Sequence, residues 1–235
     1  MKRAAIWFCW GEKHIEAAAL SAQGVAVDRF LICPRDEAAP EWRFTGVTRI
    51  DMSRRLRDKS RMAEFLPEGY DSFVFLDTDT RVLADISFGF AKAEQHGIAV
   101  APAPNYNLGA HWWFGSVMEE IGEPRADQMQ YNTGVIFFTR TPRALEVFKR
   151  WADLCTTVKV DGVDNDQPFF SLAMEQLGFV PYVLSPAYNF RGKLGDLLFG
   201  GVRIWHNSAE PPEDINKFST TWPPRVYRKG KQVLT

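Results

Sequence analysis

Short apolar runs alternate with longer amphipathic segments along the chain. The apolar runs predict strands at residues 4–10, 27–33, 73–76, 98–101, 135–138, 180–184 and 202–205. The segments between them are typical of helices at residues 12–23, 53–65, 142–156 and 167–177. Runs without a polar face are typical of a sheet that helices cover on both sides. The pattern therefore predicts an α/β fold with a mostly parallel central sheet flanked by helices.

Local signals support some of these boundaries and leave two stretches open. Gly24 follows the first helical segment, and Thr141 and Pro142 suit the start of the third. Residues 102–131 have no clear pattern, and neither do residues 207–224, which contain four prolines. Loops of this length in a compact domain are usually functional or disordered.

Composition narrows the class of protein. The chain has 235 residues, which fits one large domain. It has 28 basic and 29 acidic residues, so the net charge of −1 gives no general attraction to nucleic acid or anionic membranes. A hydrophobic content of 46% excludes disorder over most of the length. Aromatic residues reach 14%, more than a core alone suggests.

Cysteine usage and hydropathy predict a cytoplasmic protein. Cys9, Cys33 and Cys155 are odd in number and far apart, which argues against a disulfide framework or a thiolate zinc site. No apolar run approaches the roughly 20 residues that span a membrane. The basic run at residues 225–231 could contact an acidic partner or a membrane surface, and a solvated tail is the alternative.

The segment FVFLDTDT, residues 73–80, places two carboxylates directly after an apolar strand. In extended chain, Asp77 and Asp79 point the same way, at the strand end where open α/β sheets bind ligands. Such close carboxylates repel each other unless a cation lies between them, and Mg²⁺ or Mn²⁺ suits oxygen ligands. One alternative is a turn at a strand end. Another is a haloacid-dehalogenase phosphatase with Asp77 as nucleophile, although that motif has Thr or Val where Arg81 stands.

Five segments, one of which contains this motif, occur in a distinctive order. They are GEKHIEAAALSAQ (11–23), GYDSFVFLDTDTRVLADIS (69–87), YNTGVIFF (131–138), DNDQPFF (164–170) and, less distinctly, VRIWHN (202–207). Their order resembles the GT-A type nucleotide-sugar glycosyltransferases, especially the family 8 group of glycogenin and bacterial galactosyltransferases. The resemblance implies a single GT-A domain, Rossmann-like, over nearly the whole chain.

The resemblance implies a metal site. Asp77 and Asp79 would hold Mn²⁺ or Mg²⁺, which bridges the diphosphate of the sugar nucleotide, and His206 would complete the metal ligands as a neutral imidazole. A Lewis acid there stabilises the charge that develops on the departing nucleoside diphosphate. A His after an apolar strand also occurs for structural reasons, so this role rests on the resemblance.

The resemblance also implies residues beside the sugar. Asn132 and Gly134 match positions that approach the donor sugar, and a turn into a strand is the alternative interpretation. Asp166 and Gln167 match a catalytic pair beside the anomeric carbon, with Asp164 as the fallback acid. Asp166 also suits the N-cap of the following helix.

Basic and aromatic residues complete the implied donor site. Lys59 or Arg61 would face the diphosphate or the sugar, while the other basic residues of 54–61 form a solvated face. His14 falls where the family often stacks an aromatic ring on the base. The family follows its metal-binding His with Gly and then Lys-Pro-Trp, but NSAEPPEDINKF (207–218) intervenes here, which leaves Lys217 as a weak phosphate ligand.

Together these features predict a metal-dependent glycosyltransferase that uses a nucleoside diphosphate sugar, UDP-linked, with retention at the anomeric carbon. We expect a donor half over residues 1–100, an acceptor and catalytic half over 101–206, and a tail over 207–235. His111, Trp112 and Trp113 would form an acceptor platform or a lid, with core packing as the alternative. The acceptor, whether carbohydrate, lipid-linked or protein, stays open. A binding module without catalysis is the competing hypothesis.

Overall fold

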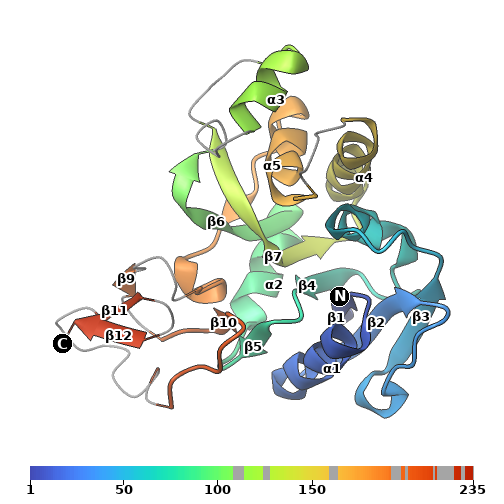
Figure 1. Cartoon of the computed structure of the whole chain (residues 1–235), viewed down its shortest axis with the longest axis vertical. Helices are drawn as coiled ribbons and strands as arrows, with labels where there is room; N and C mark the ends of the chain where they lie inside the picture. Colours follow the sequence, from blue (N-terminus) through green and yellow to red (C-terminus); the bar gives the residue numbers. More distant parts are fainter. Residues whose placement is uncertain are drawn as a thin grey trace.

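The structure of the chain is a computed structural model. Seven strands form its central sheet in the order β3–β2–β1–β4–β7–β6–β8 (Figure 1). They are β1 (Arg3–Phe8), β2 (Asp28–Pro34), β3 (Gly46–Ile50), β4 (Ser72–Leu76), β6 (Ile98–Asn107), β7 (Met129–Thr139) and β8 (Tyr182–Val183). The structure describes residues 1–107, 114–123, 128–158, 164–191, 197–198, 201–213, 215, 225–228 and 231–234.

The mostly parallel α/β sheet is confirmed, with one strand reversed. β7 runs antiparallel to both of its neighbours, β4 and β6, while the other pairings are parallel. The apolar pattern of β7 resembles that of the parallel strands because helices cover both faces of the sheet there. Hydrophobic pattern reports that burial and carries no information on strand direction.

Helices cover the two faces of the sheet in separate layers (Figure 1). The helices are α1 (Glu12–Ser21), α2 (Ser87–His96), α3 (Phe114–Glu120), α4 (Pro142–Thr157) and α5 (Gln167–Gln176), with the 3-10 helices η1 (Ala22–Gly24), η2 (Glu41–Arg43), η3 (Leu56–Phe65) and η4 (Pro186–Tyr188). Side chains of α1 and α2 share one core cluster with one face of the sheet. Those of η3, α3, α4 and α5 share a second cluster with the opposite face.

Successive strand residues feed these two cores alternately. Phe137 and Val74 belong to the α1–α2 core, whereas Phe138 and Phe75 belong to the core under α4 and α5. All four side chains are fully buried. The aromatic residues of these strands therefore serve the core, as their apolar setting predicts.

Several elements differ from the sequence expectations. The helix expected at 53–65 is the 3-10 helix η3, and residues 102–131 contain the end of β6, helix α3 and the start of β7. The helix α2 has no clear signal because Gly89 interrupts its pattern. That glycine is required by packing, since a Cβ there would lie 2.6 Å from the ring of Phe137.

Two small sheets lie beside the main one. β5 (Thr80–Val82) pairs antiparallel with β10 (Ile204–His206), which sets His206 opposite Thr80. Part of the basic run at 225–231 lies in two strands, and its solvation stays a prediction. β11 (Arg225–Arg228) pairs with β12 (Lys231–Leu234) and with β9 (Leu197–Leu198).

Two further findings bear on the chain as a whole. The cysteines Cys9, Cys33 and Cys155 are all free and buried. In the described part of the chain, no helix combines the length and the apolar character needed to cross a bilayer.

Candidate metal centre

The two aspartates follow β4 in a tight turn. The Thr80 backbone N–H donates to the Asp77 carbonyl at 3.1 Å, and the Thr80 hydroxyl donates to the same oxygen at 2.7 Å. The prediction that extended chain aligns the carboxylates is therefore wrong in its geometry. Its conclusion holds, because the turn still brings the Asp77 and Asp79 carboxylates to one place at the strand's carboxyl end.

Three ligand atoms converge at this turn. The Nε2 atom of His206 lies 3.2 Å from Asp79 Oδ1 and 3.7 Å from Asp77 Oδ2. One ligand atom from each residue lies within 4.8 Å of the other two. Two carboxylate oxygens and one imidazole nitrogen form a donor set that suits Mn²⁺ or Mg²⁺. The residues present therefore fit a divalent cation.

The electrostatics of Asp79 favour its ionised form. Burial raises the pKa of Asp79, but the hydrogen bond and charge of His206 lower it more, so that the pKa is about 2. Asp79 is therefore a carboxylate at neutral pH. The carboxylate can bind a cation without losing a proton, whereas a cation that binds His206 must replace any proton on its Nε2 atom.

Gly134 lies directly against these ligands. An added Cβ at Gly134 would collide with the His206 ring, lie 2.6 Å from its Nδ1 atom and lie 2.9 Å from Asp77 Oδ2. The Asp77 backbone N–H donates to the Gly134 carbonyl at 2.8 Å. This contact gives Gly134 a structural task, which is to leave room for two of the three ligand side chains.

A buried lysine links the Asp77–Asp79–His206 cluster to the start of α5. The Lys59 Nζ atom lies 3.3 Å from Asp77 Oδ1, 3.3 Å from Asp166 Oδ2 and 3.3 Å from the Thr133 hydroxyl. The Thr133 hydroxyl in turn donates to Asp166 at 3.1 Å. The side chains of Lys59 and Asp166 are only 13% and 6% exposed. η3, β7 and α5 thus meet at one ion-pair network.

The charges in this network depend on each other. Burial raises the pKa of Asp166, and Asp77 adds to the rise, against the lowering effect of Lys59 and Thr133. Burial alone would lower the pKa of Lys59, but Asp166 and Asp77 outweigh it and raise the pKa. Lys59 is therefore a fixed positive charge beside the cluster.

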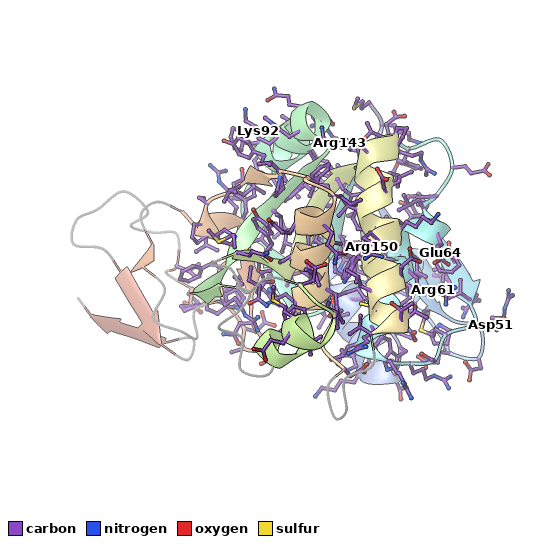
Figure 2. The ribbon with its side chains drawn as sticks, turned by 90° about the horizontal axis from the view of Figure 1, so that it is seen from above. Asp51, Arg61, Glu64, Lys92, Arg143 and Arg150 are labelled. Carbon is purple, nitrogen blue, oxygen red and sulfur yellow. The ribbon has the colours of Figure 1, made fainter. Side chains whose placement is uncertain are left out.

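Two of the predicted site residues, Arg61 and Asp164, lie outside this ion-pair network. Arg61 pairs with Glu64 at 2.9 Å on the outer surface, as Figure 2 shows, so it does not reach the cluster. Asp164 accepts the backbone N–H of Leu56 at 2.8 Å and also lies outside the network.

The alternative role of Asp166 as a helix cap is wrong for its side chain. Asp166 is the N-cap residue of α5 but makes no side-chain cap hydrogen bond. Asn165 accepts the Gln167 backbone N–H at 3.0 Å instead, which satisfies one donor of the first turn. The Asp166 carboxylate is left to face Lys59, next to Gln167 at the helix start.

A cavity of about 390 Å³ opens beside the cluster. Phe8, Trp10 and His14 contribute to its wall, and Asp77, Asp79 and Lys59 contribute to it as well. His14 lies in this wall, and its stacking on a base stays a prediction. Two cations that sequence reasoning did not single out, Lys13 and Arg81, also line the cavity.

Two residues that contact the site were not predicted, and four predicted residues lie outside the described part of the chain. Thr133 and Asn189 contact site residues, but a threonine inside a strand and an asparagine after a short turn carry no recognisable motif. The expected acceptor residues His111, Trp112 and Trp113 lie outside the described residues, as does Lys217.

A buried hydroxyl pair supports the aspartate turn from behind. The Thr80 hydroxyl contacts the Ser21 hydroxyl at 2.9 Å, and Ser21 accepts the Trp7 indole N–H at 3.1 Å. Thr80→Val preserves the shape but removes both hydroxyl contacts, so we expect a loss of about 1–3 kcal/mol in the free energy of unfolding. Urea unfolding measures it. Thr156→Val, which removes an exposed bond to the Ala152 carbonyl, is the control and should change stability by less than about 0.5 kcal/mol. Equal losses in the two variants would contradict the supporting role.

Comparison with known structures identifies the fold. Mouse xyloside xylosyltransferase 1 in its apo form matches with a TM-score of 0.58 and 14% identity over 88% of this chain and 97% of that chain. The apo form of the glycosyltransferase GlyE of Streptococcus pneumoniae TIGR4 matches with a TM-score of 0.57 and 18% identity. That match covers 94% of this chain and 57% of the GlyE chain. No family model and no curated protein matches the sequence. The chain therefore has the fold of these glycosyltransferases.

Proposed function

We propose that the protein is a metal-dependent glycosyltransferase that transfers a sugar from a nucleoside diphosphate donor. The observation that carries the proposal is the convergence of Asp77, Asp79 and His206, because the two aspartates of this cluster also line the cavity. The glycosyltransferase fold supports the reaction class. The cavity joins aromatic side chains to a cation-binding cluster, a combination that suits a nucleoside base at one end and a diphosphate at the other.

The donor would lie along this cavity. His14 and Trp10 would contact the base, and the diphosphate would reach the Asp77–Asp79–His206 cluster. Most of the lining residues come from the first 81 residues, with Asn207 and Ser208 added. This supports a donor half over residues 1–100 within a single domain. The base being uracil, and the cation being Mn²⁺ or Mg²⁺, are parts of the proposal.

The chain's own residues would act on the bond between the sugar and the diphosphate. When bound, the divalent cation supplies Lewis-acid stabilisation of the departing diphosphate. Lys59 would hold a fixed positive charge toward the same oxygens. Asp166 and Gln167 would face the sugar near its anomeric carbon, and Asn132 and Gly134 would border it. The acceptor oxygen would form the new bond to the anomeric carbon with retention, as the resemblance implies, while the sugar–diphosphate bond breaks and the hydroxyl proton passes to the departing diphosphate.

Asp79→Asn tests this proposal. We expect the variant to lose at least about 100-fold in Mn²⁺-dependent release of nucleoside diphosphate from a panel of nucleotide sugars, because one charged metal ligand is removed. Asp51→Asn is the matched control: Asp51 is a surface residue (Figure 2), its side chain is 90% exposed, and its carboxylate pairs with Arg35 at 3.3 Å. It should leave turnover unchanged.

Other outcomes would point elsewhere. Full activity in Asp79→Asn would contradict the metal-dependent reaction. Binding of nucleotide sugars without turnover, with carbohydrate and lipid-linked acceptors supplied, would support a binding module. Hydrolysis of simple phosphate esters that Asp77→Asn abolishes would support the phosphatase alternative. A thermal-shift screen with and without Mn²⁺ supplies the binding measurement, since a ligand that binds the folded state raises its apparent stability.

A further inference from the structure

A relay of buried amide hydrogen bonds lies on the side of the His206 ring that faces away from the carboxylates. The Gly134 backbone N–H donates to Asn132 Oδ1 at 2.9 Å, and Asn189 Nδ2 donates to the same oxygen at 2.9 Å. Asn189 Oδ1 then lies 2.6 Å from His206 Nδ1. Asn132, Asn189 and His206 are 2%, 5% and 4% exposed, so water has little access to replace these contacts.

The Gly134 backbone N–H fixes the donor and the acceptor of every hydrogen bond in this relay. A backbone N–H can only donate, so the Asn132 atom that faces Gly134 must be its oxygen. The Asn189 group that meets this oxygen must in turn be the amide NH₂. Asn189 therefore presents its oxygen to His206, and an oxygen acceptor requires a proton on Nδ1.

The opposite nitrogen of His206 faces the carboxylates. Nε2 lies 3.2 Å from Asp79 Oδ1 and 3.7 Å from Asp77 Oδ2. A neutral imidazole that carries its proton on Nδ1 has its free electron pair on Nε2. This is the form that can bind a cation between the ring and the carboxylates.

The position of Asn189 is itself fixed by backbone contacts on both sides. Its N–H donates to the Pro186 carbonyl at 3.0 Å at the end of η4. The next residue, Phe190, bridges to β10, where the His206 N–H donates to the Phe190 carbonyl at 2.9 Å. Asn189 and His206 are thus held on two adjacent, hydrogen-bonded segments.

We infer that Asn189 is a positioning residue that, through Asn132 and the Gly134 amide, fixes the tautomer of His206 so that Nε2 is free to bind a divalent cation. The inference rests on the metal-binding part of the proposed function. It assigns Asn132 a place in this relay, in addition to the proposed place beside the donor sugar.

The test compares Asn189→Leu with Asn189→Asp. Leucine has a similar size but no acceptor, whereas aspartate still accepts from Nδ1. Two quantities are measured: the ¹⁵N NMR signature of the His206 ring without metal, at about pH 9 where an ordinary imidazole is neutral, and Mn²⁺ affinity by electron paramagnetic resonance. His206→Gln assigns the ring signals among the four histidines.

We expect wild type and Asn189→Asp to show the Nδ1–H signature, and Asn189→Leu to lose it with about 10- to 100-fold weaker Mn²⁺ binding. Ser171→Ala is the control for a lost hydrogen bond, since Ser171 accepts the Tyr131 N–H and takes no part in the relay. It should change neither measurement.

The outcomes distinguish the relay through Asn189 from the metal-dependent function on which it rests. An Asn189→Leu protein that keeps the Nδ1–H signature and wild-type Mn²⁺ affinity would overturn the relay. Loss of the Nδ1–H signature in Asn189→Asp as well would also overturn it, because the acceptor would then not matter. Only the ring signature is compared in this variant, since its second oxygen replaces the Nδ2 donor to Asn132. A wild-type protein that binds no Mn²⁺ would overturn the metal-dependent function, and the ring signature would still decide whether Asn189 sets the tautomer.

Discussion

Gly134→Ala is expected to abolish divalent-cation binding while the protein still folds. The new methyl group would collide with the His206 ring and lie 2.9 Å from Asp77 Oδ2, so two of the three ligand side chains must move. We expect Mn²⁺ affinity to fall by about 100-fold or more and transfer activity to fall with it. Titration of Mn²⁺ by electron paramagnetic resonance and nucleoside diphosphate release measure the two effects.

Overpacking also costs stability, so the expected result needs a matched control. In Gly89→Ala, the new methyl group on α2 would lie 2.6 Å from the ring of Phe137. Phe137 is on β7, the strand that carries Gly134, but it faces the core under α2. Each variant should lose about 1–3 kcal/mol in the free energy of unfolding. Only Gly134→Ala should lose Mn²⁺ binding. Normal Mn²⁺ affinity in folded Gly134→Ala would show that the ligands have more room than the structure indicates.

Lys59→Met is expected to have the second large effect, on activity and stability together. Its ammonium group neutralises Asp166 and Asp77, and the Lys59 and Asp166 side chains are nearly buried. Removing one partner of a buried ion pair leaves an uncompensated charge and costs about 3 kcal/mol. Loss of a fixed positive charge beside the departing diphosphate should lower transfer by about 100-fold or more.

A double-mutant cycle separates these two roles. In Lys59→Met with Asp166→Asn, the buried carboxylate is neutralised, so much of the lost stability should return, while transfer should stay below that of Asp166→Asn alone. Urea unfolding and product release are measured on all four proteins. Arg3→Met, which breaks the partly buried pair with Glu94 far from the cluster, should lose stability and keep its activity. Equal transfer in the double variant and in Asp166→Asn would show that Lys59 acts only through stability.

The apolar pattern was sufficient for the main layers of the fold. Strands such as β1 and β4 and helices such as α1 and α4 follow from burial alone, because their side chains face a core that water does not reach. Strand direction and the helix α2 did not follow. The sense of β7 depends on its neighbours, and Gly89 reflects the ring of Phe137 against which it packs.

The choice between Lys59 and Arg61 shows where sequence reasoning stops. Both are basic residues of one short helix, and either could have faced the aspartates. The 3-10 winding of η3 and its packing turn Lys59 inward, while Arg61 finds Glu64 on the surface (Figure 2). A helical phase that differs from the α-helical one cannot be read from side-chain types alone.

The sequence by itself determined the α/β class, the carboxylate pair after β4 and the residue types that a cation site needs, because local pattern and side-chain chemistry are properties of short segments. Tertiary structure decided which of these groups meet. Pairing of β5 with β10 sets His206 beside Asp79, and Asn189 reaches His206 from a separate turn. Contacts between segments distant along the chain depend on how the whole core packs, and this chain's short motifs do not encode that packing.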